Sequence, residues 1–356
     1  MYVKIFISKL CLTITLQYKY NQCPLDIDYT YIVIKLCNFF SFFSIIHNSN
    51  DSLKYNTKAS INFMISFANA LEMAISNLQK PIISKFEIFY IALEIEKKGS
   101  YNNNVIKKQK NINIEKINYL IEILLDKGFI SKDIDFKSYY KINSEDRGNC
   151  EEICCMVDPF CYLSHLSAMQ KYGLTNRIPE LVILTTPKIK LWKEMKNDLE
   201  NTVKLNFQDK MLKFAKLKKT SFPSIVRKMK VKLLKRTFIH PSIKMRDSYA
   251  RISEIGHTFL DMLINPELCG GMSHIIEVWQ NNGKNYINEI IEAIDKHPQD
   301  IIKCRAGYII DEILKISDKR IEKWLKFAQR GGSRKLDPNA PYSSKFSEKW
   351  IISVNV

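Results

Sequence analysis

Apolar residues recur at helical spacing in two segments of the first half of the chain. They are SKFEIFYIALEIEKKG, residues 84–99, and IEKINYLIEILLDKGF, residues 114–129, and both carry Lys-Gly at the end, as helix C-termini commonly do. A short polar stretch, residues 100–113, separates them. The following FISKDIDFKSYYKIN, residues 129–143, is typical of two short strands. This order of elements, a helix, a short helix, a helix and a hairpin, is that of a winged helix-turn-helix. We place this domain at residues 81–145.

The second half carries both helical and strand patterns. A helical pattern around Leu163 to Tyr172 stops at Gly173, and the β-branched run LVILTTP, residues 181–187, predicts a strand. Weaker patterns of short strands or basic helices continue to Arg236. Amphipathic helices then recur in TFLDMLINPELCGGMSHIIEVWQ (258–280, broken at Pro266), YINEIIEAIDKH (286–297) and KRIEKWLKFAQ (319–329). We therefore expect a helix-rich α+β protein whose second domain, residues 158–356, ends in a helical bundle.

The first 80 residues fit neither domain. The opening MYVKIFISKLCLTITLQ resembles a signal sequence, but Lys9 splits its apolar run and no small-residue cleavage site follows. Tyr29 to Ile46 is nearly long enough to cross a membrane, yet a lysine, an asparagine and a serine interrupt it. We interpret residues 1–80 as an apolar leader outside the folded protein, and a membrane-attached binding protein is the less favoured alternative.

The charge distribution points to a polyanionic partner. The net charge is +17, and residues 188–247 alone contain 18 Lys or Arg against 5 Asp or Glu, a surplus of 13. Nucleic acid is the first candidate for a partner of such a segment. A solvated lysine-rich surface is the alternative interpretation, because runs of like charge are common on surfaces.

The winged-helix hypothesis assigns roles to particular side chains. Lysines before the second long helix and in the hairpin would neutralise phosphates, and asparagine amides at the start of that helix would pair with adenine edges. Lys116 suits either role. The DNA-binding candidates are Lys107, Lys108, Lys110, Asn111, Asn113, Lys116, Asn118, Lys132 and Lys137, with Lys218, Lys219, Arg227 and Lys228 in the basic segment.

Nine cysteines without a clean signal peptide indicate free thiols in a reducing compartment, so we expect a cytoplasmic protein. Only one cluster stands out: Cys150, Cys154, Cys155 and Cys161, with His165 nearby. Its spacing matches none of the paired CxxC frameworks of zinc sites. We therefore predict no metal and no other cofactor.

An enzyme with a phosphorylated ligand is the rival hypothesis. Its candidate groups are the carboxylates Asp261, Glu267, Asp311 and Glu312 and the arginines Arg305, Arg330 and Arg334. However, the sequence contains no P-loop, no HExxH, no GxSxG and no paired metal-binding carboxylate motif. We therefore expect a protein without catalytic residues.

Four stretches of the second half carry a family resemblance. They are LSHLSAMQKYGLTNRIPELVILTTP, ISEIGHTFLDMLINPELCGGMSHIIEVW, RAGYIIDE and AQRGGSRKLDPNAPYSSKFSEKWIISVN, of which the last is the most specific. Together they resemble the AbiEi-type antitoxins of abortive-infection, type IV toxin-antitoxin systems. The resemblance covers roughly residue 158 to the C-terminus. Its antitoxin-domain motif falls on Asp261, Arg305, Arg330, Gly331, Gly332, Arg334, Asp337 and Trp350.

The resemblance implies a bacterial protein with an N-terminal winged helix, which binds double-stranded promoter DNA and represses its own operon, and a C-terminal antitoxin domain. Such antitoxins counter a nucleotidyltransferase-like toxin without stable contact. It also implies that the C-terminal domain supports repression. A non-regulatory nucleic-acid-binding protein is the alternative, and the oligomeric state stays open.

Residues 330–350, RGGSRKLDPNAPYSSKFSEKW, raise a separate question: a phosphate-holding loop, a catalytic tail or a structural clasp. The glycine pair follows an amphipathic helix, where a glycine C-cap is expected. Pro338 and Pro341 prevent the helix from continuing, and Trp350 is followed by two isoleucines that suit a short buried strand. This pattern favours a structural clasp, with Arg330, Arg334 and Lys335 free to meet an anion.

Overall fold

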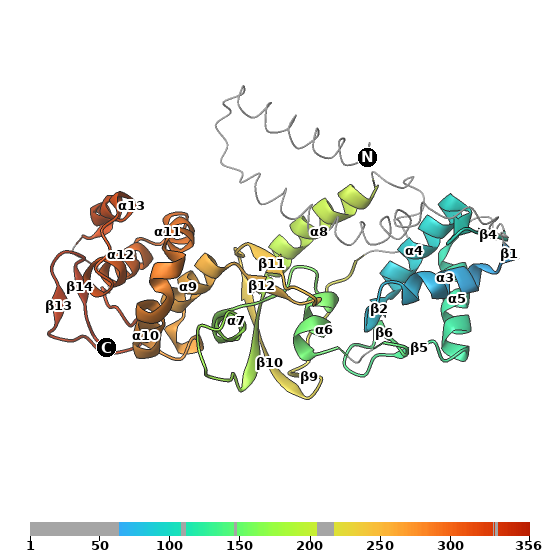
Figure 1. Ribbon diagram of the computed structural model, residues 1–356, viewed down its shortest axis with the longest axis horizontal. Helices are drawn as coiled ribbons and strands as arrows, with labels where there is room; N and C mark the ends of the chain where they lie inside the picture. Colours follow the sequence, from blue (N-terminus) through green and yellow to red (C-terminus); the bar gives the residue numbers. More distant parts are fainter. Residues whose placement is uncertain (1–63, 108–111, 146–147, 205–216, 330, 332–333) are drawn as a thin grey trace, which may run out of the picture. The chain divides into compact units, whose positions relative to one another are not determined.

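The computed structural model describes residues 64–107, 112–145, 148–204, 217–329, 331 and 334–356. Within them the chain is α+β, as the sequence patterns predicted. Figure 1 shows three groups of elements in chain order: helices with small sheets in blue and teal, a larger sheet in green and yellow, and a group of helices in orange and red. The apolar stretch from Tyr29 to Ile46 lies outside the described residues. No helix that the structure describes is long and apolar enough to cross a membrane.

The first group consists of three helices and two small sheets. Strands β2, β6 and β5 form one antiparallel sheet in the order β2-β6-β5, and β1, β4 and β3 form the other. Helix α3 packs on α4 and α5. The elements are β1 (Met64–Ile65), α3 (Phe67–Ser76), β2 (Ile82–Ser84), α4 (Lys85–Lys98), β3 (Ser100–Tyr101), β4 (Asn104–Ile106), α5 (Ile114–Asp126), β5 (Ile130–Lys132) and β6 (Tyr139–Ile142).

Local chemistry explains where α4 begins and ends. Ser84 and Glu87 form a capping box at its N-terminus, in which each side chain accepts a hydrogen bond from the backbone of the other residue. The ammonium of Lys80 lies 2.7 Å from the Glu87 carboxylate. Gly99 ends the helix with a φ of 64°, in the left-handed region that glycine adopts without strain.

Among the described residues between the two long helices, the expected short helix is not found. Residues 100–106 instead form the β3–β4 hairpin, in which Tyr101 pairs with Asn104 and only two residues make the turn. Asn102 and Asn103 have φ values of 48° and 62°. Two left-handed residues in succession form the turn that two-residue hairpins prefer, and asparagine tolerates it better than most residues.

The third helix of this group comes from the segment that we interpreted as a leader. Helix α3 lies at residues 67–76, and Leu71 and Ile75 are completely buried in its packing face. Its contacts with α4 and α5 show that it belongs to the folded protein. The folded part therefore begins before residue 81.

The second group contains a six-stranded mixed sheet in the order β11-β12-β7-β8-β10-β9. Strands β8 and β10 are parallel neighbours in the sheet, and β9, which precedes β10 in the chain, pairs antiparallel with it. The elements are α6 (Cys150–Val157), β7 (Tyr162–Leu163), α7 (His165–Lys171), β8 (Leu181–Pro187), α8 (Ile189–Lys204), β9 (Ile225–Val226), β10 (Met229–Arg236), β11 (Ser242–Lys244) and β12 (Arg251–Ser253).

A buried carboxylate joins several elements of this sheet. Asp158, which follows α6, accepts hydrogen bonds from the indole of Trp192 on α8 at 3.0 Å and from the hydroxyl of Thr186 on β8 at 2.5 Å. Its backbone carbonyl accepts from the guanidinium of Arg251 on β12 at 2.7 Å. A buried charge is tolerated only when polar partners surround it. These contacts therefore connect the end of α6 to α8 and to the strands β8 and β12.

The third group is the expected helical bundle. Its core contains the three buried tryptophans Trp279, Trp324 and Trp350. The elements are α9 (Ile255–Ile264), η1 (Pro266–Leu268), α10 (Met272–Asn282), η2 (Gly283–Tyr286), α11 (Ile287–Asp295), α12 (Asp300–Gly307), the π-helical η3 (Tyr308–Ile313), α13 (Lys319–Glu322), η4 (Lys323–Phe327) and the strands β13 (Phe346–Ser347) and β14 (Ile352–Ser353).

Candidate nucleic-acid interface and C-terminal motif

The predicted DNA-binding residues of α5 are only partly free. The side chain of Asn113 caps the helix, since its oxygen accepts a hydrogen bond from the Lys116 backbone at 2.9 Å. Asn118 accepts a hydrogen bond from the ammonium of Lys85 at the start of α4. Lys116 lies 4.9 Å from the ring centre of Tyr119, which is 58% exposed. Asn113 is therefore a capping residue, while Lys116 and Tyr119 remain accessible.

The loop before α5 is only partly described. Lys107 is exposed after β4. Lys108, Lys110 and Asn111 lie outside the described residues.

The first group of elements carries little net positive charge. Residues 64–145 contain 12 Lys or Arg against 10 Asp or Glu, and α5 itself has Lys116 against Glu115, Glu122 and Asp126. Since neutralisation of phosphates supplies most of the sequence-independent affinity for DNA, this group alone is poorly equipped to hold a duplex.

The β5–β6 loop is attached to the basic segment through two carboxylates. The guanidinium of Arg227, in the turn between β9 and β10, forms ion pairs with Asp133 and Asp135. Beside them, Phe136 is buried and packs edge-on against Phe222, with ring centres 5.5 Å apart. Arg227, which we predicted to bind DNA, is instead occupied by these intramolecular pairs.

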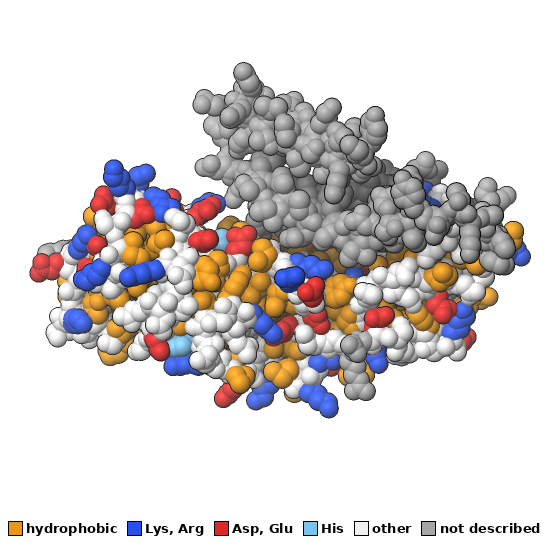
Figure 2. Space-filling model, viewed as in Figure 1, with side chains coloured by type: hydrophobic (Ala, Val, Ile, Leu, Met, Phe, Trp, Pro, Cys, Tyr) orange, Lys and Arg blue, Asp and Glu red, His pale blue; other side chains and the backbone are white. Residues whose placement is uncertain are grey.

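The lysines around this contact remain exposed. Lys132 and Lys137 flank the β5–β6 loop, and Lys228 follows Arg227 in the β9–β10 turn. In β10 the alternation of Lys230 and Lys232 places both on the surface, a signal in the run MKVKLLKR that our list of candidates missed. Figure 2 shows Lys and Arg side chains mixed with hydrophobic ones at the lower edge of the view, over the β9–β10 hairpin.

The two remaining DNA-binding candidates of the basic segment, Lys218 and Lys219, differ in whether their side chains are free. Lys218 is exposed. Lys219 donates a hydrogen bond to the carbonyl of Pro187 at 2.7 Å and lies 5.6 Å from the ring centre of Trp192. Partial burial lowers the pKa of Lys219. We therefore correct the prediction for Lys219, whose ammonium holds the end of β8 rather than facing a ligand.

Asp261, part of the expected motif, lies in a buried centre rich in histidine. Its carboxylate oxygens are 3.8 Å from Nδ1 of His165 and 3.5 Å from Nε2 of His240. The ring of His240 in turn lies 4.9 Å from that of His257. Burial by itself raises the pKa of Asp261, but His165, His240 and Arg236 outweigh it and hold the pKa at about 2.

Two buried polar atoms of this centre stand out. Nε2 of His165 and Oδ2 of Asp261 have no hydrogen-bond partner among the described residues. Across the part of the chain that the structure describes, no group of three or more His, Cys, Asp or Glu is arranged to hold a metal ion. The four cysteines of the predicted cluster, Cys150, Cys154, Cys155 and Cys161, are buried free thiols in the core beneath the sheet.

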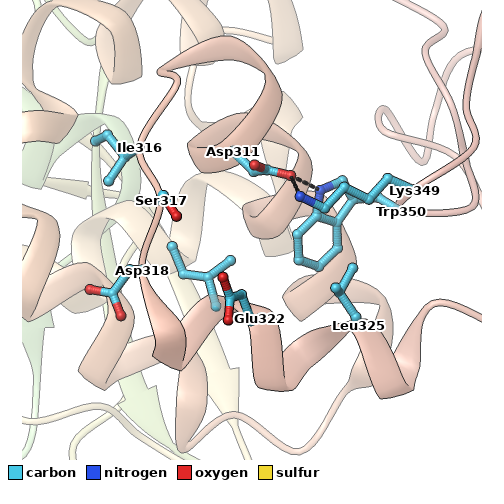
Figure 3. Close-up of a pocket in the computed structure, with 9 residues that line it drawn as sticks. Asp311, Ile316, Ser317, Asp318, Glu322, Leu325, Lys349 and Trp350 are labelled. Atoms are coloured by element: carbon cyan, nitrogen blue, oxygen red, sulfur yellow. Dashed lines mark hydrogen bonds and ion pairs between the residues drawn. The ribbon is translucent and has the colours of Figure 1, made fainter.

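The C-terminal motif forms one connected unit with α12 and its π-helical extension. The guanidinium of Arg305 donates to the carbonyl of Lys335 at 2.9 Å and to that of Leu263 at 3.0 Å. The indole of Trp350 donates to Asp311 at 3.0 Å, and the ammonium of Lys349 reaches the same carboxylate at 2.5 Å (Figure 3). The stretch RAGYIIDE is therefore in contact with the described residues 334–355 of the last resembling stretch.

The clasp interpretation fits these contacts. Arg334 donates to the carbonyl of Phe327 at 2.9 Å, so its guanidinium closes the loop after η4. Lys335 donates to the carbonyl of Ala340 at 2.7 Å, and the amide of Asn355 holds the backbone of Asp337. Gly331 adopts a φ of 122°.

Arg330 and Gly332 lie outside the described residues. The Arg334 and Lys335 cations that we left free for an anion are thus engaged in the clasp itself.

No protein-family model matches this chain, and the search of curated proteins likewise finds no match.

Substitution of Gly307 by Ala is expected to destabilise the protein. A Cβ at this position would lie 2.2 to 2.5 Å from atoms of the Trp350 ring, so one of the two must move. We expect a loss of about 1–3 kcal/mol in the free energy of unfolding, measured by urea denaturation. In the double variant with Trp350→Phe the penalty should shrink, because the removed ring atoms are those that clash. Additive effects of the two substitutions would contradict this packing.

Acid is expected to destabilise the protein through its buried histidines. Burial and the neighbouring His240 lower the pKa of His257 from 6.5 to about 3, and burial lowers that of His165 as well. The unfolded chain therefore binds a proton at higher pH than the folded chain does, so stability is complete above about pH 6.5 and falls below it. We expect His257→Gln to flatten the decline between pH 6 and pH 4 by up to about 1 kcal/mol per pH unit. An unchanged slope in chemical denaturation would contradict this assignment.

Proposed function

We propose that this chain is a DNA-binding transcriptional regulator that serves as the antitoxin of a type IV toxin-antitoxin system. The observation that supports DNA binding most directly is the order α3, β2, α4, α5, β5 and β6, with strand order β2-β6-β5. Three helices packed with a small antiparallel sheet, whose last two strands form a hairpin, are typical of a winged helix-turn-helix. In this assignment α5 is the recognition helix and the β5–β6 loop is the wing.

Two accessible groups suit α5 to the major groove. Lys116 lies in its first turn and Tyr119 one turn later, on the side that is not buried against α3 and α4. A lysine near the start of a recognition helix can reach a phosphate or a guanine edge, and an exposed tyrosine can contact bases or sugars. On the wing, Lys132 and Lys137 are exposed and suited to phosphates.

The antitoxin role rests on the resemblance of residues 158–356 to AbiEi-type antitoxins. The contacts of Arg305 and Trp350 support it, because they join two of the resembling stretches into one structural unit. Two of the four carboxylates of the rival enzyme hypothesis are occupied: Asp311 by Trp350 and Lys349, and Glu312 by the hydroxyl of Ser347. We therefore propose a non-enzymatic antitoxin, acting in the cytoplasm.

The full-length protein is expected to bind a fragment of its own promoter more tightly than a shuffled fragment of equal length. Affinity should fall steeply as salt rises, because each neutralised phosphate releases counterions. Lys116→Ala should weaken binding about three- to tenfold in fluorescence anisotropy, while the exposed Lys345→Ala, on the C-terminal clasp, serves as the matched control. Equal competition by specific and random DNA would rule out the sequence-specific function.

The toxin-antitoxin assignment has its own test. The adjacent open reading frame should encode a nucleotidyltransferase-like protein whose expression arrests growth. We expect co-expression of the present chain to restore growth, and pull-down of the tagged toxin to recover no stable complex. Continued arrest despite normal levels of this chain would contradict the antitoxin role and leave DNA binding unaffected.

A further inference from the structure

The turn between β9 and β10 departs from the usual choice of residues. Val226 pairs with Met229, so Arg227 and Lys228 alone form the turn, and their φ values are 49° and 67°. Such a turn favours asparagine and glycine, as the β3–β4 hairpin of the same protein illustrates with Asn102 and Asn103. The left-handed conformation of two long basic residues lowers the stability of the fold, so other contacts must compensate for it.

Arg227 is explained by its contacts with the β5–β6 loop. Its guanidinium pairs with both Asp133 and Asp135, and its backbone N–H donates to Asp135 at 3.0 Å. The side chain of Asp133 is only 1% exposed and that of Arg227 only 12% exposed. These contacts fasten the β9–β10 turn directly beside the β5–β6 loop.

Lys228 has no comparable partner. Its side chain is exposed, and among the described residues it forms no ion pair or hydrogen bond through its ammonium. A left-handed lysine that stabilises nothing in the folded chain suggests a contact made outside the chain. The adjoining lysines Lys132, Lys137 and Lys230 are exposed as well, so the partner that fits is a polyanion.

The distribution of charge indicates which polyanion. The elements of the proposed winged helix have only two more basic than acidic residues across positions 64–145, whereas residues 188–247 have a surplus of 13. A winged helix places its wing against the phosphate backbone of the duplex. A basic turn fastened to that wing meets the same backbone.

We propose that the β9–β10 turn is a second wing, in which Lys228 contacts a phosphate of duplex DNA and Arg227 holds the turn against the first wing. This inference rests on the proposed DNA-binding function. It gives the domain that follows the winged helix a direct part in DNA binding. It also gives Asp133 and Asp135 a role, since two acids in a DNA-facing loop would otherwise repel phosphates.

The substitution Lys228→Asn separates this role from a structural one. Asparagine suits the left-handed conformation better than lysine, so the variant should keep or raise the melting temperature. Its affinity for the promoter fragment should nevertheless fall about three- to tenfold, and the slope of log affinity against log salt should decrease by about 1. Lys315→Asn is the matched control, because Lys315 is also exposed and left-handed, with a φ of 57°, but belongs to the helical bundle. It should gain stability similarly and bind DNA as the parent does.

The outcomes distinguish this proposal from the one on which it rests. If Lys116→Ala weakens binding while Lys228→Asn does not, the second wing is wrong and the winged-helix function stands. If neither substitution alters binding to the promoter fragment, both the second wing and the assignment of α5 as the recognition helix are overturned. A loss of affinity in Lys228→Asn together with equal loss in Lys315→Asn would also overturn the second wing, because the effect would then follow total charge rather than position.

Discussion

The ion pairs of Arg227 with Asp133 and Asp135 are the contact on which the arrangement of the candidate interface depends. They join a loop of the first group of elements to a hairpin of the larger sheet, across 92 or more residues of sequence. With Asp133 almost completely buried, removal of the arginine would leave an uncompensated charge, which is far more costly than the loss of an exposed pair. Beside the same junction, Phe136 packs edge-on against Phe222.

A second set of buried polar contacts organises the C-terminal half. Arg305 joins the end of α9 to the segment around Lys335, and Asp311 receives the indole of Trp350. The π-helical stretch at residues 308–313 follows directly on the helix that carries Gly307, where the tryptophan ring lies against the backbone. Residues 334–356 are thus an integral part of the bundle, and the glycine is required because no side chain fits under the ring.

Buried and exposed charged residues have different roles in this protein. Buried charges such as Asp158, Asp261 and Arg305 connect elements and are paired or surrounded by polar groups. Exposed lysines on β10 and in the β9–β10 turn have no such role within the described residues, and they contribute part of the net charge of +17. The proposed binding to DNA accordingly uses the second kind and is positioned by the first.

The sequence by itself determined the α+β class and most of the amphipathic helices, because their apolar periodicity and glycine or proline ends are local signals. It also indicated that Trp350 returns to the core. It did not show that α3 belongs to the fold or that residues 100–106 form a hairpin, since those outcomes depend on packing and on two left-handed asparagines. Composition marked Arg227 and Lys219 as candidate DNA contacts. Only the tertiary structure brought their partners near, because ion pairs and carbonyl contacts between distant segments leave no spacing pattern in the chain.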